Sequence, residues 1–178
     1  MDVALLLFLI VLNGILAMSE IAVVSSRQSR LQKLAEDGYS GARSALSLQQ
    51  EPSTFLSTVQ VGITTVGILS GAIGEATLAA PLAQCLRSFA LLAPHADAVA
   101  LTLVVVAVTY CSVVVGELVP KRLGLLAPER VASFVAGPMG VVSRLARPLV
   151  WLLSSSSSLI LRLLGARRTQ DSTVTDDE

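Results

Sequence analysis

The sequence contains little charge and few residues that support enzyme chemistry. Only 15% of its 178 residues are charged, and it has two cysteines and one histidine. Cys85 and Cys111 lie in or beside apolar segments without a metal-like spacing, which supports neither a zinc site nor a disulfide framework. The motifs GxSxG, HExxH and CxxC are absent, as is a glycine-rich phosphate loop. We therefore expect a protein that is not an enzyme.

An excess of one charge is also lacking. Thirteen Lys and Arg residues balance thirteen Asp and Glu residues, and the basic residues are spread through loops and segment ends. A nucleic-acid-binding protein usually presents a clustered basic face, so we expect no nucleic-acid partner. The N-terminus has no basic residue before its apolar run, and that run is longer than the apolar part of a secretory signal. We interpret it as a retained membrane span.

Apolar residues are abundant instead. They make up 53% of the chain, whose mean hydropathy is +0.71, and this composition is typical of a membrane protein. Residues 3–26, 55–80 and 98–119 are each long enough to cross a hydrocarbon core of about 30 Å as a helix. We expect the second helix to stop at Pro81, because a proline inside a helix removes a hydrogen bond. The sequence thus predicts an all-α, multi-pass protein of the lipid bilayer.

The positions of the basic residues predict its orientation. Asp2 precedes the first span, whereas basic residues follow the first and third spans: Arg27, Arg30, Lys33, Arg43, Lys121, Arg122 and Arg130. The positive-inside rule places these residues in the cytoplasm. We therefore expect the N-terminus outside the cell membrane and the C-terminus in the cytoplasm. Residues 27–52 should form one or two short surface helices, interrupted at Gly38 and Gly41.

The segment after Pro128 is less apolar than a span. Arg144 and Arg147 would each cost about 2.5 to 3.5 kcal/mol at the bilayer centre, so we expect a helix lying in the cytoplasmic interface. Residues 149–164, interrupted by the serines at 154–158, form a second interfacial helix or a short fourth span, and we favour the former. Residues 166–178 lack apolar periodicity and are expected to form a linker after a membrane domain at 1–165.

Small and polar residues share one face of the second span. They are spaced by three or four positions: Ser57, Gln60, Thr64, Gly67, Gly71 and Gly74. Such a stripe is typical of close helix packing, for which Gly67 and Gly71 provide a GxxxG pair. A helix break or a short re-entrant turn at 71–75 is the alternative, because glycines weaken a helix.

Two carboxylates occupy similar depths near the predicted cytoplasmic face. Ionisable groups at the edge of a span are costly and mark ion paths or paired contacts. Glu20 of the first span and Glu117 of the third could share a cavity, with the hydroxyl groups of Thr64 and Thr65 nearby. Carboxylate, hydroxyl and carbonyl oxygens are the ligands that Mg²⁺ prefers.

Other roles for these residues remain open. Pro120 should free the carbonyl of Gly116, which is four residues earlier, and a freed carbonyl can ligate a cation. Glu117 and Lys121 could equally form a surface pair worth about 0.2 to 0.5 kcal/mol. Glu20 could pair with an arginine. Asn13 and Ser19 could form hydrogen bonds between helices or ligate a cation.

Three stretches together resemble the DUF21 membrane domain of the CNNM/CorC family. They are LNGILAMSEIAVVSSRQSRLQKLAEDG, FLSTVQVGITTVGILSGAIGE and VVVGELVPKRLGLLAPERVA. The resemblance implies three spans, juxtamembrane helices, a homodimer and Mg²⁺ export coupled to Na⁺. It also implies that nucleotide binds only through cytosolic CBS domains, which this chain lacks.

The family motifs nominate cation ligands in this chain. The resemblance places the GE-x-x-P-K turn on Glu117 and Gly116, the polar turn of the second span on Thr64 and Thr65, and a serine and acidic pair on Ser19 and Glu20. Ala17 stands where many members have a serine. We expect the membrane domain of a Mg²⁺ exporter. The alternative is a membrane anchor and dimerisation module that serves CBS domains and transports nothing.

Overall fold

The chain forms a bundle of helices in a computed structural model that describes residues 2–89 and 91–163, apart from the side chain of Arg162. The predicted linker at 166–178 lies outside the described residues. The long helices are α1 (Asp2–Ser25), α4 (Pro52–Arg87), α5 (Ala96–Val113) and α7 (Pro128–Leu163). The shorter elements are α2 (Gln28–Glu36), α3 (Ser40–Gln50), the 3₁₀ turn η1 (Ala93–His95), the π-helix η2 (Val114–Leu118) and α6 (Val119–Leu126).

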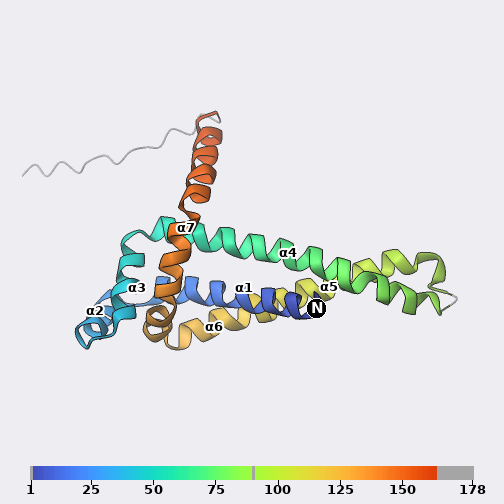
Figure 1. The fold of residues 1–178 in the computed structure, drawn as a ribbon, viewed down its shortest axis with the longest axis horizontal. Helices are drawn as coiled ribbons and strands as arrows, with labels where there is room; N and C mark the ends of the chain where they lie inside the picture. Colours follow the sequence, from blue (N-terminus) through green and yellow to red (C-terminus); the bar gives the residue numbers. More distant parts are fainter. Residues whose placement is uncertain (1, 90, 164–178) are drawn as a thin grey trace, which may run out of the picture.

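Three rods lie side by side along the long axis of the molecule. They are α1, α4, and the continuous helix formed by α5, η2 and α6 (Figure 1). The turn between α4 and α5 closes one end. At the other end, which we call the basic end, lie α2, α3, α6 and the start of α7. It carries most of the basic residues: Arg27, Arg30, Lys33, Arg43, Lys121, Arg122 and Arg130.

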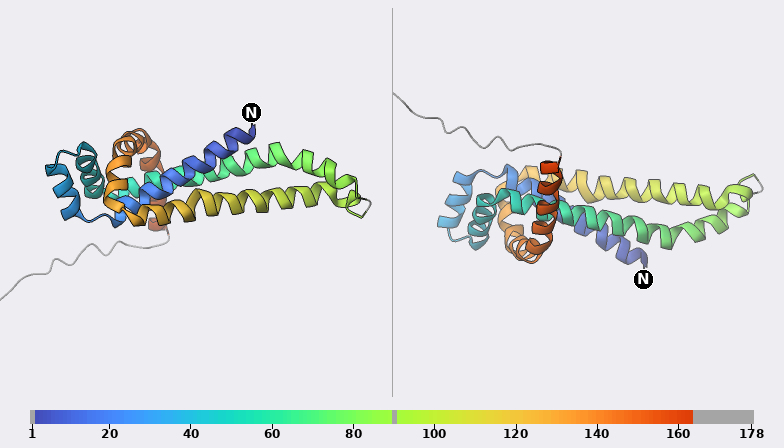
Figure 2. Two further views of the ribbon diagram at one scale, coloured as in Figure 1. Left: turned by 90° about the horizontal axis from the view of Figure 1, so that it is seen from below. Right: turned by 90° about the horizontal axis from the view of Figure 1, so that it is seen from above.

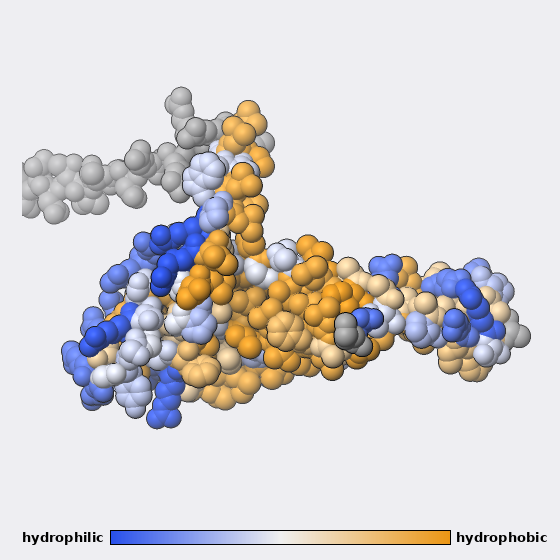
Figure 3. Space-filling model, in the orientation of Figure 1, coloured by the Kyte–Doolittle hydropathy of each residue, from blue (hydrophilic) through white to orange (hydrophobic). Residues whose placement is uncertain are grey.

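All three rods are long and apolar enough to cross a membrane. The candidate spans are Asp2–Ser25, Pro52–Arg87 and Ala93–Leu126, which confirms the three predicted spans. Apolar side chains cover the middle of the rods, and hydrophilic side chains gather at both ends (Figure 3). The 36 residues of α4 extend about 54 Å, which exceeds a hydrocarbon core of about 30 Å. The ends of α4 therefore reach beyond the apolar layer.

The predicted stop at Pro81 is wrong, and the alternative of a break at residues 71–75 is not found. The helix passes through Pro81 and ends at Arg87, and it is continuous across residues 71–75. A single proline removes one hydrogen bond, which the remaining bonds of a long membrane helix tolerate. Gly67 and Gly71 leave open space where a Cβ atom would stand, whereas a methyl group on Gly74 would lie 2.7 Å from Val108 Cγ2. Within this chain, Gly74 is therefore the glycine of this stripe that allows α4 to pack closely against α5.

The third predicted span is also longer than expected. The helix does not end at Val119 but continues as α6 to Leu126. The five-residue π-helix η2 stands just before Pro120 and connects α5 to α6 without a break. Prolines fit at the start of a helical segment, where their missing N–H group is not needed.

The surface segment at 27–52 forms two helices, as predicted. The chain reverses at Gly38, whose φ of +92° favours glycine. Gly41 does not interrupt a helix but lies inside α3, where a Cβ atom would collide with the backbone of Ser133 in α7. Gln49 of α3 donates hydrogen bonds of 2.9 Å to the carbonyls of Val23 and Ser26, which fixes α3 to the end of α1.

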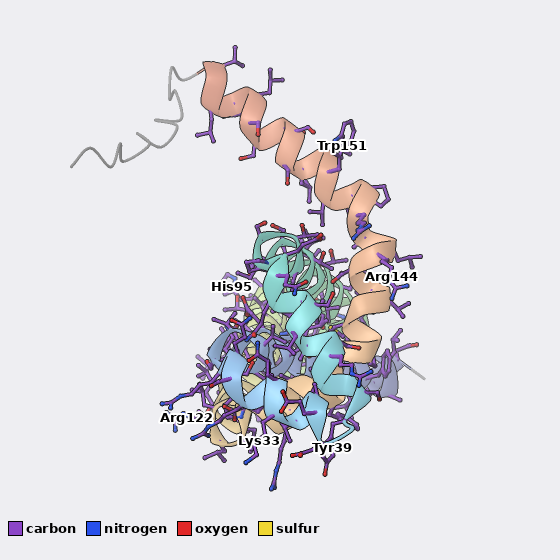
Figure 4. The ribbon with its side chains drawn as sticks, turned by 90° about the vertical axis from the view of Figure 1, so that its left-hand side faces the viewer. Lys33, Tyr39, His95, Arg122, Arg144 and Trp151 are labelled. Carbon is purple, nitrogen blue, oxygen red and sulfur yellow. The ribbon has the colours of Figure 1, made fainter. Side chains whose placement is uncertain are left out.

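The segment after Pro128 is a single helix instead of the two that we expected. Helix α7 runs through Pro138 and Pro148, and it changes direction between Arg144 and Trp151 (Figure 4). A proline kink at Pro148 accounts for that bend. Beyond the bend, α7 crosses the direction of the three rods (Figures 1 and 2), and α7 is not among the candidate spans found in the described residues. This arrangement fits the interfacial helix that the arginines predicted.

Buried apolar side chains hold the basic end together. One cluster joins α1, α2, α3, α4 and α7, and its best-buried members include Leu31, Phe55, Val59 and Ala132. A second cluster joins the first half of α1 to α5 through Leu6, Ile10, Val104 and Val108. Helix α1 thus contacts both clusters, and this position fixes the orientation of its polar residues.

Candidate cation site between α1 and α6

The π-helix sets the geometry of the site. Because Pro120 has no N–H group, it cannot donate the α-helical hydrogen bond to the carbonyl of Gly116, as the sequence predicted. The structure supplies another donor, since Asn13 Nδ2 of α1 donates a hydrogen bond of 3.0 Å to Gly116 O. The interhelical role of Asn13 is therefore confirmed. The carbonyl of Gly116 already accepts one bond, and its use as a cation ligand stays a prediction.

Close approach of two backbones makes this hydrogen bond possible. A methyl group on Gly14 would lie 2.9 Å from Pro120 Cγ, and one on Gly116 would lie 3.2 Å from Ile10 O. A methyl group on Gly124 would lie 3.0 Å from Met18 O. Glycines at these three positions let α1 pack directly against η2 and α6, as small residues commonly do between membrane helices.

Two carboxylates from different helices converge on one ammonium group. Lys121 Nζ lies 2.8 Å from Glu117 Oε1, to which it donates a hydrogen bond, and 3.6 Å from Glu20 Oε2. The side chains are partly enclosed, with exposed fractions of 33% for Lys121, 38% for Glu117 and 23% for Glu20. Glu20 and Glu117 therefore lie near the same ammonium group, which agrees with the similar depth predicted for them. The predicted pair between Glu117 and Lys121 is also confirmed.

A cavity opens beside Glu20, whereas Glu117 and Lys121 do not line it, so the prediction that the two carboxylates share a cavity is not confirmed. The cavity has a volume of about 650 Å³, and its lining includes Glu20 from α1, Ser57 and Gln60 from α4, and serines from the last part of α7. Small-molecule pockets typically occupy about 300 to 1,000 Å³. The cavity offers one carboxylate and several neutral hydrogen-bonding groups at the basic end, so it can hold a polar cation larger than a bare metal ion.

Sequence reasoning missed the contribution of α7 to this cavity. The serine run was interpreted as an interruption of an apolar stretch, yet Ser154, Ser157 and Ser158 line the cavity together. Their spacing of three and four positions is the signal for a shared helix face. This spacing alone does not show what the serine face contacts. The facing residues, Ser57 and Gln60 of α4, lie about 95 residues earlier in the sequence.

The other predicted ligands are not brought to the two carboxylates by any described contact. Ser19 is fully buried, and its hydroxyl donates a hydrogen bond of 2.6 Å to Ile15 O in its own helix. Thr64 and Thr65 are exposed on α4. Their roles as cation ligands remain predictions.

The described residues contain no cluster of three or more His, Cys, Asp and Glu side chains that could hold a metal ion. The site instead pairs two carboxylates with a lysine, which leaves one net negative charge. An amine-bearing cation can form the same hydrogen bond to Glu117 and the same ion pair with Glu20 that Lys121 forms, because both carry N–H donors on a positive nitrogen. A hydrated metal ion can approach the same carboxylates through its waters.

Comparisons with known proteins agree with the fold. A family model described as "Cyclin M transmembrane N-terminal domain" (CNNM) matches residues 4–178. A UPF0053 protein of Synechocystis sp. is 49% identical over 96% of this chain and 38% of its own length. Proteins named "Polyamine export protein" from Haemophilus influenzae and Escherichia coli K12 are 32% and 31% identical over 96% and 99% of this chain. The chain spans 39% of each of those two relatives.

Proposed function

Since the chain belongs to the CNNM transmembrane-domain family, we propose that it forms the membrane part of a cation exporter. The observation that carries the proposal is the convergence of Glu20 and Glu117 on one positive nitrogen, beside a polar cavity at the basic end. Carboxylates at such a depth are costly and usually serve an ion or substrate path. On the orientation that the charges predict, the cavity opens toward the cytoplasm, from which an exporter takes its cargo.

The geometry favours an organic cation that carries several ammonium groups. Lys121 already places an ammonium group between the carboxylates, and the cavity of about 650 Å³ has room for a chain-like molecule. Its serine and glutamine groups can accept hydrogen bonds from further amines. The printed name of the relatives from Haemophilus influenzae and Escherichia coli, which concerns those proteins, points to the same class of cargo.

Magnesium is the second candidate. The oxygens of Glu20 and Glu117, with the remaining lone pair of the Gly116 carbonyl and the hydroxyl of Ser19, are hard ligands of the kind that Mg²⁺ prefers. Mg²⁺ usually keeps several waters, and the cavity can hold a hydrated ion. Export coupled to Na⁺ belongs to this candidate, as the family resemblance implies.

A homodimer is part of the proposal. Gly67 and Gly71 lie on the exposed side of α4 with no atom within 4 Å of an added Cβ, so the helix of a second copy could approach closely there. Because the chain covers about two fifths of its relatives, nucleotide regulation through CBS domains would belong to a part of the protein outside this chain.

Transport by purified protein in liposomes tests the proposal. We expect wild-type protein to move labelled spermidine, and Glu117→Gln to lower the rate about ten- to hundredfold, because a charge-assisted hydrogen bond contributes about 1.5 to 3 kcal/mol. Glu75→Gln is the matched control, since Glu75 is an exposed carboxylate on α4 that forms no ion pair among the described residues. Mg²⁺ flux with the same dependence on Glu117 would select the second candidate.

Two results would contradict transport through this site. Equal transport rates for Glu117→Gln and Glu75→Gln would show that Glu117 does not take part in transport. A folded wild-type protein that moves neither spermidine nor Mg²⁺ would favour the alternative of a membrane anchor that transports nothing.

A further inference from the structure

A second cavity lies earlier along α7 than the serine run, between α3, the start of α4 and the part of α7 before its bend. It has a volume of about 200 Å³ and is lined by both polar and apolar groups. Ser44, Ser47 and Thr54 contribute hydroxyl groups to its lining, and Arg144 and Arg147 contribute guanidinium groups. The cation site described above uses none of these residues.

One buried hydroxyl in this cavity lacks a partner. Ser143 is 9% exposed, lines the cavity, and its Oγ has no hydrogen bond among the described residues. Other serines of α7 bond to their own helix, since Ser133 Oγ donates to Glu129 O at 2.7 Å and Ser156 Oγ donates to Leu152 O at 2.9 Å. A buried hydroxyl without a partner costs free energy, so its presence points to a ligand that forms the missing hydrogen bond.

The charge of the lining suits an anion. Glu51 also lines the cavity and lies 3.7 Å from Arg147, which it partly neutralises. Arg144 has no ion pair among the described residues. Two arginines against one glutamate leave one net positive charge. Guanidinium groups beside hydroxyl groups are typical of sites that bind phosphate.

The position of the cavity at the bend of α7 indicates that a phosphate bound there belongs to a membrane lipid. Arg144 lies on α7 just before the bend, and Trp151 lies just after it (Figure 4). Leu145, Leu149 and Trp151 do not line the cavity, but they are exposed on the same stretch of α7 and offer an apolar surface for acyl chains. Tryptophan is enriched at membrane interfaces, and basic pockets on the cytoplasmic side commonly bind anionic headgroups.

We propose that this cavity binds the phosphate group of an anionic phospholipid. Arg144 donates charge-assisted hydrogen bonds to the phosphate oxygens, and Ser143 Oγ donates the bond that it otherwise lacks. The lipid thereby links α3 and the start of α4 to α7 and holds the interfacial helix against the bundle. The inference is independent of the identity of the transported cation.

Lipid retention in nanodiscs tests the proposal. The protein is reconstituted in equal amounts of phosphatidylcholine and phosphatidylglycerol, extracted, and analysed by native mass spectrometry. We expect wild-type protein to retain phosphatidylglycerol preferentially, and Arg144→Gln to lower this retention about tenfold. Arg130→Gln is the matched control, because it removes the same charge from α7 at a position that does not line this cavity.

A second variant tests the cavity without destabilising α7. Alanine at Gly137 and Gly140 meets no atom within 4 Å, and it improves helix propensity while its methyl groups narrow the cavity. We expect Gly137→Ala/Gly140→Ala to lower phosphatidylglycerol retention without lowering the melting temperature. Unchanged retention in both this variant and Arg144→Gln would overturn the proposal.

Two further comparisons test whether the effect is specific to this site and whether the anion is a lipid. If Arg130→Gln lowers retention as much as Arg144→Gln does, the effect is one of overall charge and the site is refuted. If inorganic phosphate added to phosphatidylcholine nanodiscs raises the melting temperature as much as phosphatidylglycerol does, the ligand is soluble phosphate and the lipid assignment is wrong.

Discussion

Replacing Asn13 by alanine should destabilise the contact between α1 and the π-helix. The substitution removes the hydrogen bond of 3.0 Å to Gly116 O and leaves that carbonyl, in a buried residue, without its donor. A buried acceptor without a partner costs about 1 to 3 kcal/mol. Asn13 Oδ1 has no partner among the described residues, and its removal offsets part of this loss. We therefore expect the free energy of unfolding to fall by about 1 to 2 kcal/mol.

Equilibrium unfolding in mixed micelles, followed by circular dichroism, measures this loss. Thr102→Ala is the control, because the exposed Thr102 hydroxyl donates only to Ala98 O in its own helix, and we expect a change within about 0.5 kcal/mol. A double-mutant cycle with Pro120→Ala isolates the cause, since an N–H group at position 120 gives the carbonyl an intrahelical donor. The loss from Asn13→Ala should then shrink. An equal loss in both backgrounds would refute the role assigned to the freed carbonyl.

Two glycines should respond in opposite ways to alanine in the same assay. Gly41→Ala places a methyl group against the Ser133 backbone, so we expect it to separate α3 from α7 and to lower the free energy of unfolding by about 1 to 3 kcal/mol or more. Gly67→Ala enters open space within one chain, so we expect it to raise the unfolding free energy of the monomer by about 0.5 to 1 kcal/mol, whereas in the proposed homodimer the methyl group would lie in the contact. If Gly41→Ala leaves the free energy of unfolding unchanged, α3 and α7 are not in the close contact described.

Hydropathy and spacing predicted much of the molecule. The span at 3–26 agrees with α1 to within a residue or two, because a long run without charge has few alternatives to a membrane helix. The pair of Glu117 and Lys121 followed from their spacing of four residues. The approach of Glu20 followed from comparing depths along two spans, which needs only the rise per residue.

The missed features depend on contacts between distant segments. Pro81 was expected to end a helix from its local effect, but the length of α4 and its packing on α5 outweigh one lost hydrogen bond. The π-helix has no local sequence signal of its own, and its carbonyl is satisfied by Asn13, 103 residues away. The serine face of α7 acquires a role only when the bend at Pro148 brings it over α1 and α4.

The central claim is that the Lys121 ammonium occupies the position of the transported cation. The chain has two lysines, and Lys33 lies exposed on α2, so amine-reactive labelling read by mass spectrometry compares Lys121 with an internal control. In membranes without added cation, Lys121 should react more slowly than Lys33. Saturating spermidine or Mg²⁺ should displace Lys121 from Glu20 and Glu117 and raise the ratio of the Lys121 rate to the Lys33 rate severalfold. This ratio cancels the loss of reagent to the amines of spermidine. A ratio that does not respond to any cation that the protein transports would contradict the account.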